Sequence, residues 1–356
     1  MELQVSKPIA DKARPIPIGE HATVGTGNDS RRVDAFKQTD EIHLDVTLGR
    51  EIGYEFARIG LKLPEDSALA LREGYAEGSQ RRGGGTAMST RWERKLLRLR
   101  ASAWRRNRLV DPQVTPQYIE AIQVGHCPIT HGELTSGTGT ETDATIDRVF
   151  NGGAYAVGNL AVMSMKANRA KANLMPLEIV DAAMSGCTAE GLSNLEWMRL
   201  AALTSASAPP GYPQTQLPML VYPPNGLLIS NGYVVLQQSF SALAVGWIKE
   251  KWVRDFRAAC MGKKRKRAFD DFMVTLTSVL SRSTRGISSP ELYRFGIADA
   301  WAEAIVFERY VGLMSGASKD QVVAMISIAQ RAQESLHSLE KESLKAWSVE
   351  TRGYAK

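Results

Sequence analysis

One short segment, from Cys127 to Lys171, constrains the fold more than any other part of the chain. Cys127 to Thr130 predicts a short extended start. Ala144 to Phe150 alternates and is rich in β-branched residues, which predicts a strand. Asn151-Gly152-Gly153 is typical of a turn. From Asn159 to Lys171, apolar or small residues recur at helical spacing. The segment therefore predicts two strands followed by a helix.

The polar residues of this segment follow a fixed order. Asp147 and Arg148 lie on the second predicted strand, and Asn159 lies at the predicted helix entry. Asn168 and Lys171 lie one turn apart near the helix end, so they share a face. Taken singly, each has a structural interpretation: Asp147 would pair with Arg148 or Lys171, and Asn159 would cap a helix. The ordered set is more specific than any one of its short motifs.

This ordered set resembles the HNH, or ββα-metal, nuclease family over about residues 126–175. In that family a strand carries an Asp-His pair, and an Asn follows at the helix start. A second Asn or His comes later in the helix, often with a Lys one turn beyond. Asp147-Arg148, Asn159, Asn168 and Lys171 match these positions. The sequence departs from the family at Arg148, which stands where the catalytic His is expected.

The resemblance implies one divalent cation, Mg²⁺ or Mn²⁺. Asp147 and the side-chain carbonyl of Asn168 would hold it, because both supply hard oxygen ligands. Such an ion stabilises the charge that develops at a scissile phosphate. The resemblance thus makes Asp147, Arg148 and Asn159 candidate catalytic residues, with His131 as a further candidate.

The departure at Arg148 leaves the general base open. A guanidinium stays protonated and cannot accept a proton, although it can clamp a phosphate. A base could come from His131 or His126, which flank the first predicted strand, because His titrates near neutral pH. A metal-bound water could also act with little assistance from a base, or the site could be inactive and only bind.

A basic helix is predicted immediately before this segment. It begins at the capping box Thr90-x-x-Glu93 and runs to about Asn107. From Arg81 to Arg108 there are ten basic residues and one acidic residue. This excess of positive charge is larger than in the mixed charge pattern of an ordinary exposed helix. Such a surface suits phosphate contacts. The candidate nucleic-acid-binding residues are Arg91, Arg94, Lys95, Arg98, Arg105 and Lys171.

Composition narrows the class of protein. The 356 residues carry a net charge of +6, which permits a polyanionic partner without demanding one. The three cysteines, Cys127, Cys187 and Cys260, form no CxxC pair, so no structural zinc is predicted. No apolar run approaches the ~20 residues that span a bilayer. We therefore expect a cytoplasmic protein without a membrane partner.

The predicted fold class is α+β, mostly α, with a small ββα module embedded between helical regions. A hairpin is predicted near residues 227–236, because Asn231-Gly232 between apolar runs favours a tight turn. Helices are predicted over 240–259, after Ser289-Pro290, and from Ser318 to about Val349. The predicted regions are a flexible arm (1–40), a mixed region with a Gly-rich hinge (41–88), the basic helix and module (89–205), a linker (206–218), and a hairpin with a helical C-terminal domain (219–356).

Three functions follow from these patterns. The leading prediction is an HNH-like, metal-dependent endonuclease that hydrolyses phosphodiester bonds in nucleic acid, with DNA expected. The second is a catalytically inactive HNH-like nucleic-acid-binding protein. The third is a structural protein with a vestigial module, which forms homo-oligomers through its C-terminal helices. Divalent-metal-dependent cleavage separates the first two, and a requirement for the Arg81 to Arg108 segment in binding separates the last two.

Overall fold

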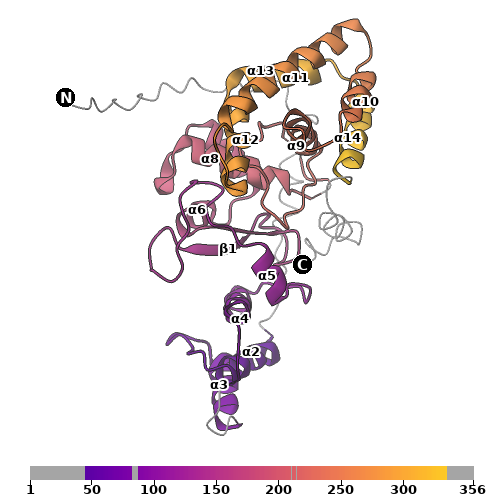
Figure 1. Cartoon of the computed structure of the whole chain (residues 1–356). Coiled ribbons are helices and arrows are strands. Elements are labelled where there is room, and N and C mark those ends of the chain that lie inside the picture. The colour runs from indigo at the N-terminus through magenta and orange to yellow at the C-terminus, as the bar shows by residue number, and fades with distance from the viewer. Residues whose placement is uncertain (1–44, 82–86, 210, 214, 335–356) are drawn as a thin grey trace, which may run out of the picture.

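The computed structural model describes residues 45–81, 87–209, 211–213 and 215–334. The described chain is mostly helical with one two-stranded antiparallel sheet, which confirms the mostly-α, α+β class. In Figure 1 the earliest helices lie at one end, the sheet lies in the middle and the last helices lie at the other end. The predicted arm at 1–40 and most of the predicted Gly-rich hinge fall outside the described residues.

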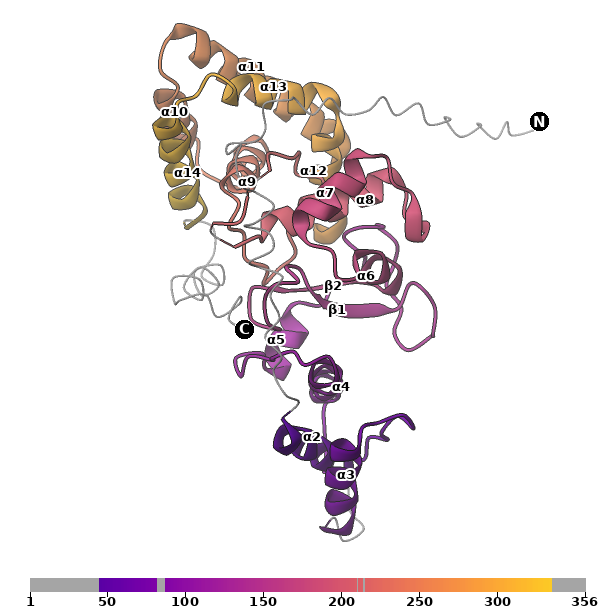
Figure 2. The same ribbon diagram turned by 180° about the vertical axis from the view of Figure 1, so that it is seen from behind.

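The helices before and after the sheet divide into two groups. The first group is α2 (Val46–Arg58), α3 (Leu69–Arg81), α4 (Arg91–Arg105) and α5 (Pro116–Ala121). After the module come α7 (Pro176–Met184), a 3₁₀ turn η1 (Ala189–Gly191), α8 (Asn194–Ala206), α9 (Gly232–Ala244), α10 (Lys251–Ala259), α11 (Lys263–Ser283), α12 (Pro290–Ala302), α13 (Ala304–Met314) and α14 (Lys319–Glu334). Figure 2 shows α7 and α8 between the sheet and the last helices.

Helices α2 and α3 approach each other closely through glycines. A Cβ placed on Gly53 would overlap the backbone carbonyl of Leu71, and one placed on Gly74 would overlap the carbonyl of Arg50. Only the absence of a side chain lets the two backbones come this near. This pair shares a small core around Ile52 with α4, which contributes Leu97 and Trp104.

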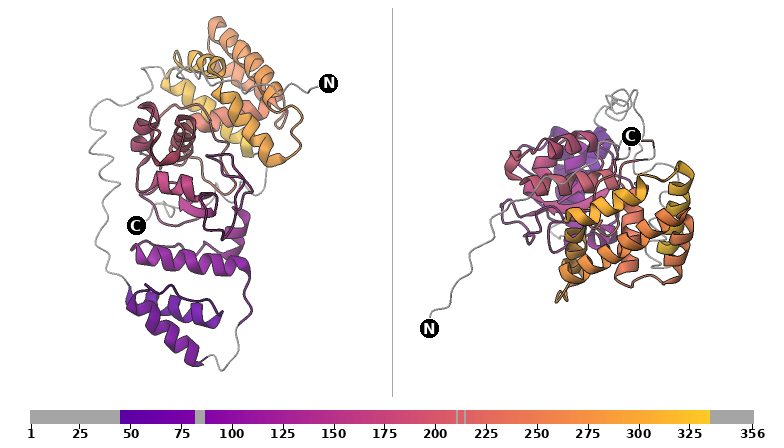
Figure 3. Two further views of the ribbon diagram at one scale, coloured as in Figure 1. Left: turned by 90° about the vertical axis from the view of Figure 1, so that its left-hand side faces the viewer. Right: turned by 90° about the horizontal axis from the view of Figure 1, so that it is seen from above.

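Helix α4 joins that pair to the sheet. The predicted capping box is confirmed, because Thr90 Oγ1 accepts from the Glu93 amide and the Glu93 carboxylate accepts from the Thr90 amide. Trp104 packs into the core of α2 and α3, whereas Leu99 and Ala103 pack with the strands. Figure 3 shows α4 running between the pair of α2 and α3 and the rest of the described chain. Its remaining face is free to carry charge.

The module contains two strands and a helix, but with shifted bounds. Strand β1 (Ala144–Arg148) pairs antiparallel with β2 (Leu160–Ser164), and α6 (Met165–Lys171) follows directly. The helix predicted from Asn159 is therefore wrong over its first half, because pairing with β1 outweighs the local helical spacing. Ser164 is the N-cap, and its side chain accepts from the Ala167 amide at 3.2 Å.

The predicted extended start at Cys127 to Thr130 is also wrong. The His131 amide donates to the Cys127 carbonyl at 2.8 Å, so this stretch is a tight turn. The Cys127 thiol is buried and accepts from the Ser164 amide at 3.4 Å. The turn thereby fastens to the junction of β2 and α6.

Residues 227–236, all within the described range, do not form the predicted hairpin. Asn231 instead caps α9, where its side-chain oxygen accepts from the Tyr233 amide at 3.0 Å. Asparagine serves helix caps and turns by the same side-chain acceptor, so the dipeptide alone does not distinguish them. Leu227 makes only an isolated bridge to Gly158. The predicted linker contributes Leu217 to a buried core, so this connection is packed.

The other C-terminal helices follow the sequence more closely. The helix predicted over 240–259 is divided into α9 and α10, with Gly246 between them at a φ of 77°. The start after Ser289-Pro290 is confirmed as α12. Ser318 and Gln321 form the predicted cap of α14, whose described part ends at Glu334.

Candidate functional site

A buried cluster of three polar side chains, those of Asp147, Asn151 and Lys171, joins the hairpin of β1 and β2 to the end of α6. Lys171, at the end of α6, is fully buried and places its Nζ 2.9 Å from Asp147 Oδ2 on β1. The same Nζ donates to Asn151 Oδ1 at 2.7 Å. The side-chain nitrogen of Asn151, Nδ2, donates to the carbonyls of Ala172 and Leu174. The cluster therefore ties the strand, the loop after it and the end of the helix together.

Burial decides what Lys171 can do. Removal from water lowers the pKa of its ammonium, and the neighbouring Asp147 carboxylate opposes that change. With an exposed fraction of 0 %, Lys171 cannot contact a nucleic-acid phosphate in this conformation. Its predicted role in nucleic-acid binding would require the side chain to become exposed. The structural interpretation of Asp147, a carboxylate paired with Lys171, is what the structure shows.

Arg148 is directed at the loop between the strands. One guanidinium nitrogen donates to the carbonyls of Asn151 at 2.7 Å and Gly153 at 2.8 Å. Its Cζ lies 5.2 Å from the centre of the Tyr155 ring, and the whole side chain is buried. Arg148 therefore shapes the loop. Because one of its nitrogens already donates to two carbonyls, Arg148 has fewer N–H groups left to bind a phosphate directly.

Asn159 closes the same loop from its other end. Its side-chain oxygen accepts from the Phe150 amide at 2.9 Å, and its side-chain nitrogen donates to the carbonyls of Phe150 and Ala154. It is completely buried and precedes β2, so it is not the cap of a helix. Asn159 positions backbone and has no exposed atom to offer a substrate.

The predicted metal ligands are Asp147 and Asn168. Carboxylate and amide oxygens suit Mg²⁺ or Mn²⁺ in kind. A bound dication would have to displace the Lys171 ammonium, which lies against the Asp147 oxygen that would hold the ion. That oxygen has no well-aligned hydrogen bond among the described residues. Asn168 lies one turn before Lys171 and is partly exposed. Within the described ranges, no three His, Cys, Asp or Glu side chains gather as a metal site.

His131 packs against α12, one of the C-terminal helices. Its ring stacks on Phe295 of α12 with centroids 4.0 Å apart. Burial lowers the pKa of His131 to about 4, and the charge of Arg199 adds to that effect. No hydrogen bond or ion pair of the described residues joins His131 to Asp147. His126, the other candidate base, is held by Glu291 at 3.3 Å.

The basic face of α4 is exposed, as its sequence predicts. Arg91, Arg94 and Arg98 are exposed and form no ion pair with a described carboxylate. Arg91 lies over the Trp92 ring at 4.2 Å. Lys95 is different: its Nζ donates to Gln123, and burial lowers its pKa.

The last candidate on this helix, Arg105, also differs from the exposed trio. Its guanidinium lies 3.7 Å from the Asp66 carboxylate. A surface ion pair of this kind is weak. It nevertheless gives Arg105 a neighbouring negative charge, whereas the trio of Arg91, Arg94 and Arg98 has no such partner among the described residues. Three of the five predicted cations on α4 therefore remain available to an anion.

Two residues that matter to the cluster are not marked as site residues by the sequence. Asn151 reads as part of a turn, yet it binds Lys171. Tyr155 ends the short motif Gly152-Gly153-Ala154-Tyr155, to which the sequence assigns no role, yet its ring touches Arg148 and its hydroxyl accepts from Arg106 at 2.6 Å. The order of motifs in the sequence marks the loop that carries both residues. The contacts depend on non-local folding and leave no local signal.

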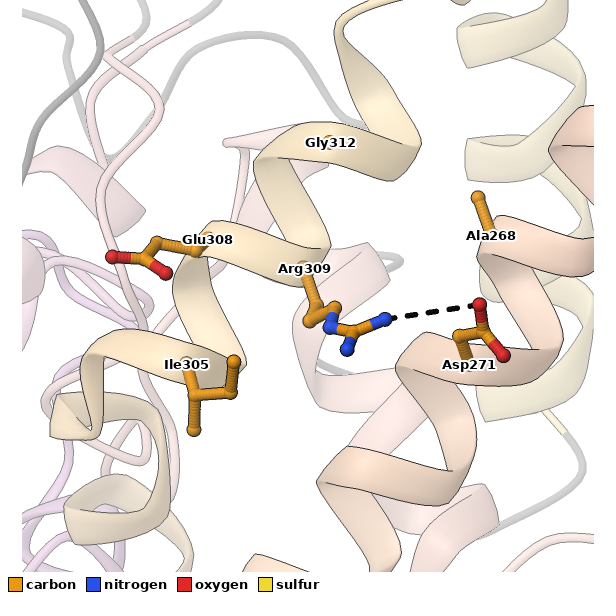
Figure 4. Close-up of a pocket in the computed structure, with 6 residues that line it drawn as sticks. All are labelled: Ala268, Asp271, Ile305, Glu308, Arg309 and Gly312. Carbon is orange, nitrogen blue, oxygen red and sulfur yellow. Dashed lines mark ion pairs between the residues drawn. The ribbon is translucent and has the colours of Figure 1, made fainter.

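A separate open pocket lies between α11 and α13, far along the chain from the module. Its volume is about 310 Å³. Arg309 lies 3.7 Å from Asp271, and Figure 4 marks this ion pair between two of the lining residues. The lining residues are Ala268, Asp271, Ile305, Glu308, Arg309 and Gly312. Since the basic group among these described residues is already paired, the lining presents no unpaired cation to an anionic ligand.

Comparison with known proteins finds no family model, no curated protein and no solved structure that matches this chain. Across the described residues, no helix combines the length and the apolar character needed to cross a bilayer.

Proposed function

We propose that the protein binds the phosphate backbone of nucleic acid through an HNH-like ββα module and the basic face of α4. DNA is the substrate to test first. The observation that carries the proposal is the charge of Arg91, Arg94 and Arg98, which no described carboxylate balances, on a helix that packs directly against the hairpin.

Some exposed arginines elsewhere have carboxylate partners, such as Arg50 with Glu73 and Arg282 with Glu303. Others, such as Arg72 and Arg254, form no ion pair with a described carboxylate. Arg91, Arg94 and Arg98 differ in lying three and four residues apart, on one face of a helix that packs against the hairpin. Unpaired cations on one helix face repel each other and gain most from a polyanion, whose counterions they release. The trio therefore supports binding to a phosphate backbone more than it supports folding.

The test compares two triple variants with the same loss of charge. Arg91→Gln, Arg94→Gln and Arg98→Gln removes the trio, whereas Arg50→Gln, Arg282→Gln and Arg309→Gln removes arginines that pair with acids. Fluorescence anisotropy with a labelled DNA duplex, and with an RNA duplex of the same sequence, measures affinity. We expect the first variant to bind at least tenfold more weakly than the second. Equal affinities would contradict the proposal.

A second candidate function is metal-dependent cleavage by an HNH-like endonuclease. The observation that favours it is the hairpin followed by a helix, with Asp147 on β1 and the partly exposed Asn168 on α6. Mg²⁺ or Mn²⁺ remains the proposed cofactor. Because Lys171 lies against Asp147, such an ion has to compete with the ammonium.

Plasmid incubation tests this candidate. Wild-type protein is incubated with supercoiled plasmid in Mg²⁺, in Mn²⁺ and in excess EDTA, beside Asn168→Ala. Asn168 is the cleaner position to change, because losing the Asp147 carboxylate would leave Lys171 buried without its countercharge. Cleavage in either metal that EDTA and Asn168→Ala both abolish supports an endonuclease. Cleavage that persists in EDTA, or no cleavage in either metal, refutes it.

A further inference from the structure

We propose that Arg106, Arg108 and Arg148 form a binding site for one phosphodiester group beside Tyr155, at the point where α4 meets the loop between β1 and β2. The site rests on the proposed nucleic-acid function and adds the place where a single backbone phosphate is held. Arg106 and Arg108 are the members that solvent reaches, although Arg106 also donates to Ser102, and Arg148 supplies a buried positive charge.

The geometry brings two guanidinium groups to one phenol. A nitrogen of Arg106 donates to the Tyr155 hydroxyl at 2.6 Å, and the Arg106 Cζ lies 5.7 Å from the ring centre. The Arg148 Cζ lies 5.2 Å from the same centre. Tyr155 is fixed in place because its amide donates to the Leu109 carbonyl and its carbonyl accepts from the Asp111 amide. The chain after α4 is thereby held against the loop.

Arg108 belongs to the same cluster of charge. Burial lowers the pKa of the Arg108 guanidinium, and the positive charges of Arg148 and Arg106 lower it further. Arg108 follows Arg106, the C-cap of α4, by two residues, so it lies at the same end of the helix. Arg106 is exposed and Arg108 is partly exposed, so both can be reached from solvent.

The three arginines lack a carboxylate partner within the part of the chain that the structure describes. The neighbouring Arg105, by contrast, lies 3.7 Å from Asp66. Asp147, the acid next to Arg148 in sequence, is already paired with Lys171. Arg106 and Arg148 both contact Tyr155, and neither they nor Arg108 form an ion pair with a described carboxylate.

A buried polar atom points the same way. Arg148 has an exposed fraction of 4 %, and its Nε has no hydrogen-bond partner among the described residues. Unsatisfied buried donors are rare in folded proteins and call for an explanation such as an absent ion. An oxyanion held by Arg106 and Arg108 would compensate this charge.

The shape of the donors selects the ligand class. Guanidinium groups present paired N–H donors in a plane, which matches the oxygens of a phosphate better than a single ammonium does. Residues Arg91 to Arg98 lie further along the same helix. A nucleic-acid backbone along α4 could therefore place one phosphate at this cluster and others at the trio.

The first test uses inorganic phosphate as the probe and does not depend on nucleic acid. Melting temperature is measured in sodium phosphate and in sodium chloride at equal ionic strength, for wild type, for Arg106→Gln with Arg108→Gln, and for Arg309→Gln as control. We expect phosphate to raise the melting temperature of wild type and of the control by a few degrees, and not that of the double variant. An equal rise in all three, or none in wild type, overturns the site.

The second test separates this site from the proposed function. On duplex DNA, loss of one phosphate contact should flatten the slope of log affinity against log salt by about 0.9. We expect that change from the double variant and none from Arg309→Gln. If the double variant keeps the wild-type slope while the Arg91, Arg94 and Arg98 variant binds weakly, the site fails and the proposed function stands. If wild type takes up phosphate but binds no duplex, the proposed function fails alone.

Discussion

Replacing Lys171 by Met tests the buried cluster behind the hairpin. The side chain is fully buried, and its Nζ contacts Asp147 at 2.9 Å and Asn151 at 2.7 Å. Methionine has a similar length and no charge, so it keeps most of the packing. It leaves the Asp147 carboxylate, itself 6 % exposed, without a countercharge.

The expected loss is large for one substitution. Breaking a buried ion pair from one side costs about 3 to 5 kcal/mol, because the remaining charge is desolvated and uncompensated. Loss of the hydrogen bond to Asn151 adds about 1 kcal/mol. We therefore expect Lys171→Met to lower the free energy of unfolding by about 4 to 6 kcal/mol at pH 7.

A double variant separates charge from packing. In Asp147→Leu with Lys171→Met, no charge of the pair remains buried, so the stability should return to within about 1 to 2 kcal/mol of wild type. Urea unfolding followed by circular dichroism measures all three proteins. The reasoning is refuted if Lys171→Met alone unfolds within about 1 kcal/mol of wild type, or if the double variant is no more stable than the single one.

Three further changes test other parts of the structure. The pKa of His131 is about 4 when folded and 6.5 in the free side chain, so its contribution to stability is present above pH 6.5 and lost as pH falls toward 4. Since the ring is partly exposed, we expect this loss of unfolding free energy to be about 1 to 2 kcal/mol. Urea unfolding at several pH values should show the loss in wild type and not in His131→Gln. Gly53→Ala should cost about 1 to 3 kcal/mol by forcing a Cβ against Leu71, whereas Gly312→Ala, which meets open space, should be neutral or stabilising in the same assay. Asn159→Ala should cost about 2 to 4 kcal/mol, because it leaves backbone groups of the loop unpaired, and hydrogen exchange should show that loop opening first.

Local signals predicted what local interactions decide. The capping box at Thr90 marked the start of α4 correctly, because a cap is satisfied within four residues. The β-branched run in the segment that begins at Ala144 indicated β1. The basic face of α4 was also predictable, since residues three and four apart share a face of any helix.

Distant partners decided the rest. Leu160 to Ser164 has helical spacing in isolation, but β1 pairs with it and makes it a strand. Asn231 suits a turn or a cap equally, and the helix that follows it settles the choice. Lys171 has a charge that suggests solvent, and only the folded module brings Asp147 and Asn151 around it. In each case the sequence names the residue and the tertiary structure assigns its role.

The salt dependence of duplex binding tests the central claim most directly. If Arg91, Arg94 and Arg98 each contact a phosphate, their replacement by Gln should flatten the slope of log affinity against log salt by up to about 2.7, or three contacts. The matched variant at Arg50, Arg282 and Arg309 should keep the wild-type slope. Equal slopes for the two variants would contradict the claim that α4 and the module it packs against bind the nucleic-acid backbone.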